Sequence, residues 1–111
     1  MTGMNAATSD LVFRAVADPT RRGILDLLLG SPRSVGDIVG RFRVSQPTIS
    51  VHLRVLARAG LVDRRRDGRR IFYGLRPEGI RRVHDWSAHY ARFWEDRLRA
   101  LGARLDQTRE T

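Results

Sequence analysis

The chain has 111 residues, enough for one domain with a modest hydrophobic core. It contains no cysteine, so disulfides and thiolate metal sites are excluded. No apolar run approaches the roughly 20 residues that span a bilayer, and no charged-then-apolar leader opens the chain. We therefore expect a cytoplasmic protein without a membrane segment.

The net charge of +9 is concentrated in the middle of the sequence. Residues 41–76 carry ten arginines and two acids, residues 1–40 carry four of each, and residues 77–111 carry seven arginines and six acids. A basic segment between balanced flanks indicates a polyanionic partner. A solvated charge run and an anionic membrane surface are the alternatives, although the segment has no basic amphipathic helix with bulky apolar anchors.

The first elements are expected to be short helices. Residues 1–9 are small and polar, and we expect a disordered tail. Asp10 can cap a first helix, which Asp18 ends because a residue before proline avoids the helical region. Pro19 then opens a second helix with an apolar stripe, and Gly30 begins the loop that follows it.

Ser34 begins a third helix, and Asp37 lies three residues further on, at the second position of a capping box. Gly36 and Gly40 weaken this helix by propensity, so we expect it to depend on packing against its neighbours. Very few residues separate it from the next helix. Two short helices joined so closely predict a helix-turn-helix.

The fourth helix is expected at residues 46–59, within the stretch VSQPTISVHLRVLARAGLV. Ser45 is a suitable N-cap, and Gly60 ends the helix. One face of this helix is apolar. The other is a short polar face, which suits base edges and phosphates in a major groove. An ordinary amphipathic surface helix is the alternative. The apolar face consists of Ile49, Leu53 and Leu56.

Residues 61–75 change to a period of two, and Asp67-Gly68 predicts a type I′ turn between two short strands. Ile71 and Tyr73 are expected on one face of the second strand. The like charges around the tip repel one another, so the hairpin is well suited to a sugar-phosphate backbone. A solubilising turn is the alternative. The arginines around the tip are Arg64, Arg65, Arg66, Arg69 and Arg70.

Pro77 opens the last and longest helix, which we expect to run to about Leu105. Its large apolar residues exceed what a small domain needs for its own core. If exposed, this stripe predicts pairing with a second copy about a two-fold axis, with help from the first helix. A helix folded over its own core is the alternative. The expected interface residues are Leu11, Val83, Trp86, Tyr90, Phe93, Trp94, Leu98 and Leu101.

Three stretches together closely resemble the ArsR-type winged-helix repressors: LVFRAVADPTRRGILDLL, SVGDIVGRFRVSQPTISVHLRVLARAGLV and RRRDGRRIFYGL. The resemblance covers residues 11–75 well and the last helix loosely. The expected fold is mostly α with a small β-hairpin, a winged helix-turn-helix that is dimeric through its terminal helices. Residues 10–76 would form the DNA-binding domain, residues 77–106 the dimerisation helix and residues 107–111 a tail.

The resemblance also implies which residues contact DNA. His52 lies beside the apolar face of its helix, so it either packs there or touches phosphate. The expected base-facing residues are Gln46, Thr48, Ser50, Val51 and Arg54. The expected phosphate-facing residues are Ser45, His52, Arg58, Arg64, Arg65, Arg66, Arg69 and Arg70.

Many members of the resembled family sense metal ions, and their best-known site is a cysteine pair that this chain lacks. A second family site uses acids and histidines along the final helix. His84 and His89 lie five residues apart here, on poorly aligned faces, so we expect surface histidines, no metal and no cofactor. The other candidate metal ligands on this helix are the acids Asp85, Glu95 and Asp96.

We therefore predict a sequence-specific transcriptional regulator, a homodimeric repressor that binds palindromic double-stranded DNA through residues 46–59 and an arginine-rich wing. The alternatives are a non-specific architectural DNA-binding protein and a metal-sensing repressor with a site on the last helix. A pure interaction protein would leave the basic segment unexplained. An enzyme is not expected, because there is no cysteine nucleophile, glycine-rich phosphate loop or histidine paired with an activating acid.

Overall fold

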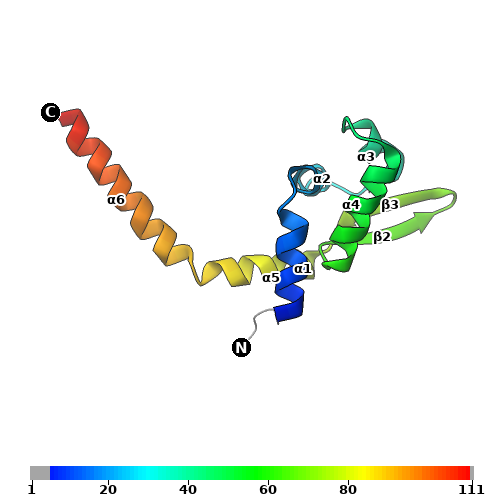
Figure 1. Cartoon of the computed structure of the whole chain (residues 1–111), viewed down its shortest axis with the longest axis horizontal. Coiled ribbons are helices and arrows are strands. Elements are labelled where there is room, and N and C mark those ends of the chain that lie inside the picture. The colour runs from blue at the N-terminus through cyan, green and yellow to red at the C-terminus, as the bar shows by residue number, and fades with distance from the viewer. Residues whose placement is uncertain (1–5, 111) are drawn as a thin grey trace.

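A computed structural model of the chain describes residues 6–110. It is mostly helical with a three-stranded antiparallel sheet, which is the predicted winged helix-turn-helix architecture (Figure 1). The elements in order are α1 (Ala6–Val16), α2 (Pro19–Leu28), β1 (Arg33–Ser34), α3 (Val35–Gly40), α4 (Gln46–Arg58), β2 (Val62–Asp67), β3 (Arg70–Leu75), α5 (Pro77–Ala88) and α6 (Ala91–Glu110).

Helix α1 begins at Ala6, so Asp10 lies inside the helix and does not cap it. Alanine is the strongest helix former, and Ala6 and Ala7 extend the helix toward the N-terminus. Residues 6–9 are therefore helical, contrary to the expected tail, while residues 1–5 lie outside the described residues. At the other end of the chain, helix α6 includes residues 107–110, which were also expected to form a tail.

The expected caps of α2 and α3 are present. The carboxylate of Asp18 accepts a hydrogen bond from the backbone N–H of Arg21 at 3.0 Å, and Pro19 occupies the first turn of α2. The hydroxyl of Ser34 accepts from the N–H of Asp37 at 3.1 Å. These bonds satisfy N–H groups that a helix leaves without an internal partner, so both starting points are fixed locally.

Helix α4 has the predicted start, stop and buried face. The hydroxyl of Ser45 accepts from the N–H of Thr48 at 3.3 Å, and Pro47 lies in the first turn. Gly60 follows the helix with a φ of 75°, a left-handed conformation that glycine adopts without steric cost. The three predicted apolar residues are all buried, so the opposite face is presented to solvent.

The sheet has the order β1-β3-β2. Strand β1 was not predicted, because its two residues are too few to show an alternating pattern; Arg33 pairs with Tyr73. The turn type was predicted wrongly. In the hairpin Asp67 pairs with Arg70, and among its residues only Gly68 has a positive φ, of 64°, which fits a type II′ turn with glycine first.

The core lies between helices α1 to α5 and one face of the sheet. Val62 and Tyr73 are buried at the base of the hairpin, so the hairpin contributes to the core although its tip is exposed. Apolar burial of this kind supplies most of the free energy that holds α4 in place. The largest fully buried side chains are Ile24, Ile38, Ile49, Leu53, Leu56 and Leu61.

The single long helix predicted from Pro77 is in fact two helices, with the break at His89 and Tyr90. Near the break, the hydroxyl of Ser87 donates to the carbonyl of His84 at 2.9 Å. Such back-bonding bends helices. The N–H of Tyr90 donates to the carbonyl of Ser87 at 2.9 Å, a three-residue step that tightens the last turn of α5.

Helix α6 projects from the body, on the opposite side from the hairpin (Figure 1). The radius of gyration is 18.1 Å, whereas a compact chain of this length has about 13 Å. The alternative in which the last helix folds over its own core is therefore wrong for α6. No helix in residues 6–110 combines the length and apolar character needed to cross a membrane.

Candidate nucleic-acid interface

Over residues 46–54, α4 carries a solvent-exposed face that is mostly polar. Gln46, Thr48 and Arg54 are exposed, Ser50 is half-buried, and Val51 is 49% exposed. The hydroxyls of Ser45 and Thr48 lie 2.9 Å apart at the start of the helix. All five predicted base-facing residues therefore lie on one accessible stretch of one helix.

Helix α4 and the hairpin form one continuous surface. Ser50 and Arg54 from α4 line a shallow depression of about 330 Å³ together with Arg64 from β2. Ile71 and Tyr73 from β3 also line it. A ligand that contacts the exposed face of α4 can consequently contact the hairpin at the same time.

The strand register divides the hairpin arginines between two faces. Arg64 is paired with Tyr73 and Arg66 with Ile71, so both arginines lie on the face turned to the core and α4. Arg65 is paired with Phe72, on the outer face. The two rows can therefore flank a backbone that lies along the hairpin.

Arg70 also lies on the outer face of the hairpin, where its guanidinium stacks 5.1 Å above the centre of the Phe72 ring. Arg69 lies in the turn itself. Within residues 6–110, no ion pair joins an acid to Arg54, Arg58 or the hairpin arginines. These guanidinium groups are therefore available to phosphates.

Two predicted phosphate-facing residues lie away from this surface. Arg58, at the end of α4, lines a hollow of about 310 Å³ with Leu11 and Arg14 of α1. The side chain of His52 is only 14% exposed and points toward α2. Both of its ring nitrogens lie near protein groups, and a phosphate contact by His52 stays a prediction.

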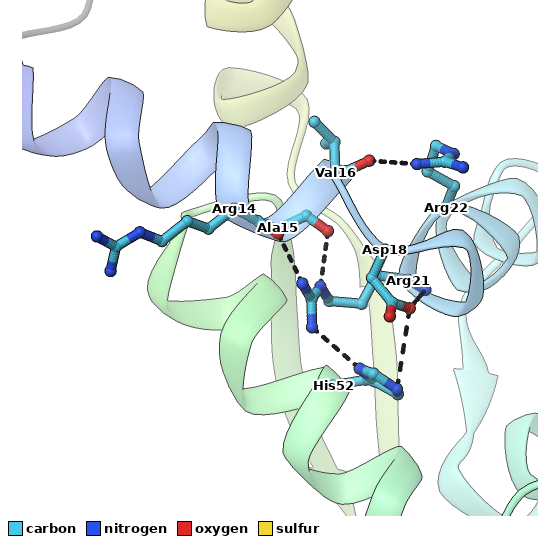
Figure 2. A network of polar contacts seen from close by, with 7 residues as sticks. All are labelled: Arg14, Ala15, Val16, Asp18, Arg21, Arg22 and His52. Carbon is cyan, nitrogen blue, oxygen red and sulfur yellow. Dashed lines mark hydrogen bonds and ion pairs between the residues drawn. The ribbon is translucent and has the colours of Figure 1, made fainter.

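Figure 2 shows the network that surrounds His52, which sequence analysis missed. Arg21 donates from Nη1 to Nδ1 of His52 at 3.1 Å, and from Nε and Nη2 to the carbonyls of Ala15 and Arg14 at 2.7 and 2.6 Å. Nε2 of His52 lies 3.9 Å from the carboxylate of Asp18. The network thus joins α4 to the junction between α1 and α2.

The adjacent residues Arg21 and Arg22 donate hydrogen bonds to the carbonyls at the C-terminus of α1. Arg22 donates from Nη1 to the carbonyl of Val16 at 2.7 Å, beside the two carbonyls that accept from Arg21. Carbonyls at a helix C-terminus lack internal partners and favour cations. At the other side of the junction, the hydrogen bond from the N–H of Arg21 lowers the pKa of the Asp18 carboxyl below its usual value.

Comparison with known proteins points to the same family that the sequence motifs resemble. The family model for bacterial regulatory proteins of the arsR family matches residues 18–64. The chain is 40% identical over 79 residues to the transcriptional repressor SdpR of Bacillus subtilis, covering 71% of this chain and 88% of SdpR. The chain belongs to the ArsR family.

Further relatives extend the likeness to the last helices. An HTH-type transcriptional regulator of Mycobacterium tuberculosis is 36% identical over 97 residues, which is 87% of this chain and 88% of that protein. The solved structure of an ArsR-like transcriptional regulator from Rhodococcus sp. is 30% identical with a TM-score of 0.69, covering 86% of this chain and 90% of the other. This ArsR-family chain is therefore a DNA-binding transcriptional regulator with a winged helix-turn-helix fold.

This ArsR-family regulator exposes an apolar surface on its terminal helices. Phe13, which sequence analysis did not include, contacts Trp86 with ring centres 4.8 Å apart, and Trp86 lies 5.2 Å from Tyr90. Val83 packs against the chain's own core, while the side chain of Trp94 lies outside the described part. The exposed fractions are Leu11 39%, Phe13 40%, Tyr90 48%, Phe93 49%, Leu98 66%, Leu101 54% and Leu105 55%.

Within residues 6–110, His84 of α5 and His89, its C-cap, belong to no metal-binding group. Nδ1 of His84 lies 3.5 Å from the carboxylate of the adjacent Asp85, and His89 is exposed at the end of the helix. Among the residues that the structure describes, no three histidine, cysteine or acidic side chains are grouped as metal ligands would be. That the regulator needs no metal stays a prediction.

Proposed function

We propose that this ArsR-family regulator is a homodimeric repressor that binds a palindromic operator. The main support is the continuous surface made by the exposed face of α4 and the hairpin, which share the depression lined by Ser50, Arg54 and Arg64. In this proposal residues 46–54 of α4 enter the major groove and the hairpin follows the sugar-phosphate backbone.

The exposed face of α4 has the chemistry of base reading. Gln46 can donate to and accept from adenine, and Arg54 can form two hydrogen bonds with guanine. Val51 can contact a thymine methyl group, and the hydroxyls of Thr48 and Ser50 can donate or accept. These roles discriminate between bases, which a purely architectural DNA-binding protein does not require.

Phosphate contacts would come from the helix start and the hairpin. Exposed Ser45 stands at the N-terminus of α4, where helix N–H groups favour an anion. Arg58, near α1, would contact the backbone at the far end of α4. The hairpin residues in this role are Arg64, Arg65, Arg66, Arg69 and Arg70.

A second copy would cover the apolar surface of the terminal helices. A projecting helix with exposed leucines and aromatic rings is unfavourable in water, and a two-fold axis lets the same surface serve both copies. The axis would also present two copies of α4 to half-sites about one helical turn, or a multiple of it, apart.

Repression is proposed by analogy with SdpR, whose name describes it as a transcriptional repressor. Bound over a promoter, a dimer of this kind would block access of the polymerase. We propose that it acts in the cytoplasm, where bacterial DNA lies.

Selection of bound duplexes from a random pool tests this proposal. We expect a palindromic sequence and at least about a thousandfold preference over random duplex at physiological salt. Sedimentation of the free protein and of its complex would give the number of copies. A monomer, or a preference below about tenfold, would instead favour the architectural alternative.

A further inference from the structure

The side chain of His52 points away from the DNA-facing side of α4 and into the α1–α2 junction (Figure 2). Its neighbours in sequence, Val51 and Leu53, are an exposed and a buried residue, so His52 stands at the border between the two faces of the helix. The ring is mostly covered, and its two nitrogens face Arg21 of α2 and Asp18, the N-cap of that helix.

Hydrogen-bond chemistry determines the form of this ring. A guanidinium can only donate, so Nδ1 of His52 must accept from Nη1 of Arg21. The tautomer that makes this bond has its hydrogen on Nε2, which lies 3.9 Å from the carboxylate of Asp18. A leucine would fill the same space but could not accept the hydrogen bond.

Both partners of His52 are themselves held in place. Arg21 is bound to two carbonyls at the end of α1, and Asp18 caps the start of α2. Their other hydrogen bonds lie within the junction of those helices and do not involve α4. The hydrogen bond from Arg21 to His52 therefore joins the α1–α2 junction to α4 in one preferred direction.

Apolar packing alone leaves the rotation of α4 less well defined. The contacts of Ile49, Leu53 and Leu56 are buried but non-directional, whereas a hydrogen bond favours one orientation. Base reading requires side chains to be held within about 0.5 Å of their productive positions. A small rotation of α4 would move Arg54 and Gln46 away from the bases that they are proposed to read, without unfolding the domain.

We propose that His52 is a positioning residue for sequence reading, which holds α4 at the rotation that aligns its exposed face with the bases. The inference rests on the proposed function, because it concerns how a specific operator is read. Phosphate contacts from the flexible hairpin arginines tolerate a small rotation. His52 should therefore affect binding to the operator more strongly than binding to random DNA.

The test compares His52→Leu, His52→Asn and His52→Gln with the wild-type chain. Each is titrated with the duplex recovered by selection and with a random duplex, over a range of salt concentrations, well below its Tm. We expect His52→Leu to weaken operator binding about tenfold or more, the effect of losing a hydrogen bond to a charged group. Random-duplex affinity should change much less, because only Ser45 and Arg58 among the proposed phosphate contacts would move with α4, and the salt slope should stay the same.

Asparagine provides the conservative rescue. Its Oδ1 lies close to the position of Nδ1 and can accept from Arg21, so His52→Asn should recover most of the lost affinity. Glutamine places its amide further out, toward Asp18, and should recover less. His84→Asn is the matched control, because the side chain of His84 is 78% exposed on α5. If His52→Leu does not fold, the order of the other two variants decides.

Two results would overturn the inference. Equal weakening on operator and random duplex, with a shallower salt slope, would make His52 a phosphate contact. A lower Tm with operator affinity unchanged would make the network purely structural. Lack of operator preference in the wild-type chain is a separate outcome, since it counts against the proposed function before any variant is compared.

Discussion

Arg54 and Arg64 line the same depression, but they belong to different parts of recognition. Arg54 projects from the helix proposed to enter the groove, and Arg64 from the strand proposed to follow the backbone. We expect Arg54→Ala to cost about 1–3 kcal/mol at one operator position and to relax the base preference there. Arg64→Ala should weaken all duplexes nearly equally and reduce the salt slope by about one.

Binding titrations on the operator, on single-base variants of it and on random duplex would separate the two arginines. His84→Asn serves as the control, since its side chain lies on α5. Equal losses for Arg54→Ala on every duplex would contradict base reading by this residue.

Asp18 links the stability of the junction to pH. The N–H of Arg21 holds the pKa of Asp18 below its ordinary value of 3.8, so the folded state favours the ionised carboxylate. This stabilisation is present above the unfolded pKa and is lost as the pH falls through the lower folded pKa. Asp18→Asn can still cap α2 but carries no charge. It should therefore lower Tm near neutral pH, and the difference should shrink in acid.

Thermal unfolding of Asp18→Asn from about pH 7 to about pH 3 checks this expectation. Asp26→Asn is the matched control, because Asp26 is exposed further along the same helix. A Tm difference for Asp18→Asn that stays constant down to the lowest pH would contradict the role assigned to the carboxylate.

At the scale of single residues, sequence analysis predicted what depends on near neighbours. Ser34 and Ser45 cap helices that begin one residue later, so the signal and the structure lie in the same few residues. The link from His52 to Arg21 spans 31 positions and exists only after α2 and α4 have packed. No local sequence pattern predicts a contact between residues so far apart in the chain. The same holds for Phe13, whose ring meets Trp86 of a distant helix.

At the scale of elements, the first turn of α5 packs closely against the backbone after α4, where Gly79 meets Gly60. A Cβ atom at Gly79 would overlap the backbone carbonyl of Gly60, and the N–H of Arg76 donates to the carbonyl of Leu61 at 2.9 Å. Helix α5 therefore packs directly on the backbone that follows α4. Gly79→Ala should force the two apart, with a cost of about 1–3 kcal/mol of unfolding free energy.

Gly36→Ala is the matched control for this prediction. A Cβ at Gly36 would meet no atom within 4 Å, and alanine is the better helix former, so we expect no loss and a gain of up to about 1 kcal/mol. Urea unfolding of both variants gives the two free energies. A Gly79→Ala variant as stable as the wild type would contradict the close backbone approach.

The elements that were predicted wrongly share a physical cause. The apolar repeat of residues 77–105 continues through the break at His89, so periodicity alone could not reveal two helices. Strand β1 exists because Arg33 and Ser34 pair with β3, not because of their own pattern. The turn was assigned one residue too early, since Asp67 still pairs in the hairpin. In each case a hydrogen bond that the sequence pattern does not reveal decided the structure: strand pairing for β1 and for the turn, and the short-range bonds of Ser87 and Tyr90 at the helix break.

At the scale of the whole molecule, the projecting α6 is the strongest argument for a dimer (Figure 1). Sequence analysis predicted the apolar stripe on it, because helical periodicity reveals a face, but not that the helix leaves the body of the chain. A single copy leaves Leu98 and Leu101 in water, with more than half of each side chain exposed. Covering them is the simplest role for a second copy.

The double variant Leu98→Glu, Leu101→Glu should therefore be monomeric, because two buried carboxylates without partners would oppose pairing. Operator affinity should fall about a hundredfold or more, since the second half-site would no longer be held close to a second α4. Leu29→Glu is the control, because Leu29 is 76% exposed at the end of α2 and should leave both properties unchanged. Sedimentation and operator titration measure them. A double variant that still sediments as a dimer would move the interface to α1 and α5.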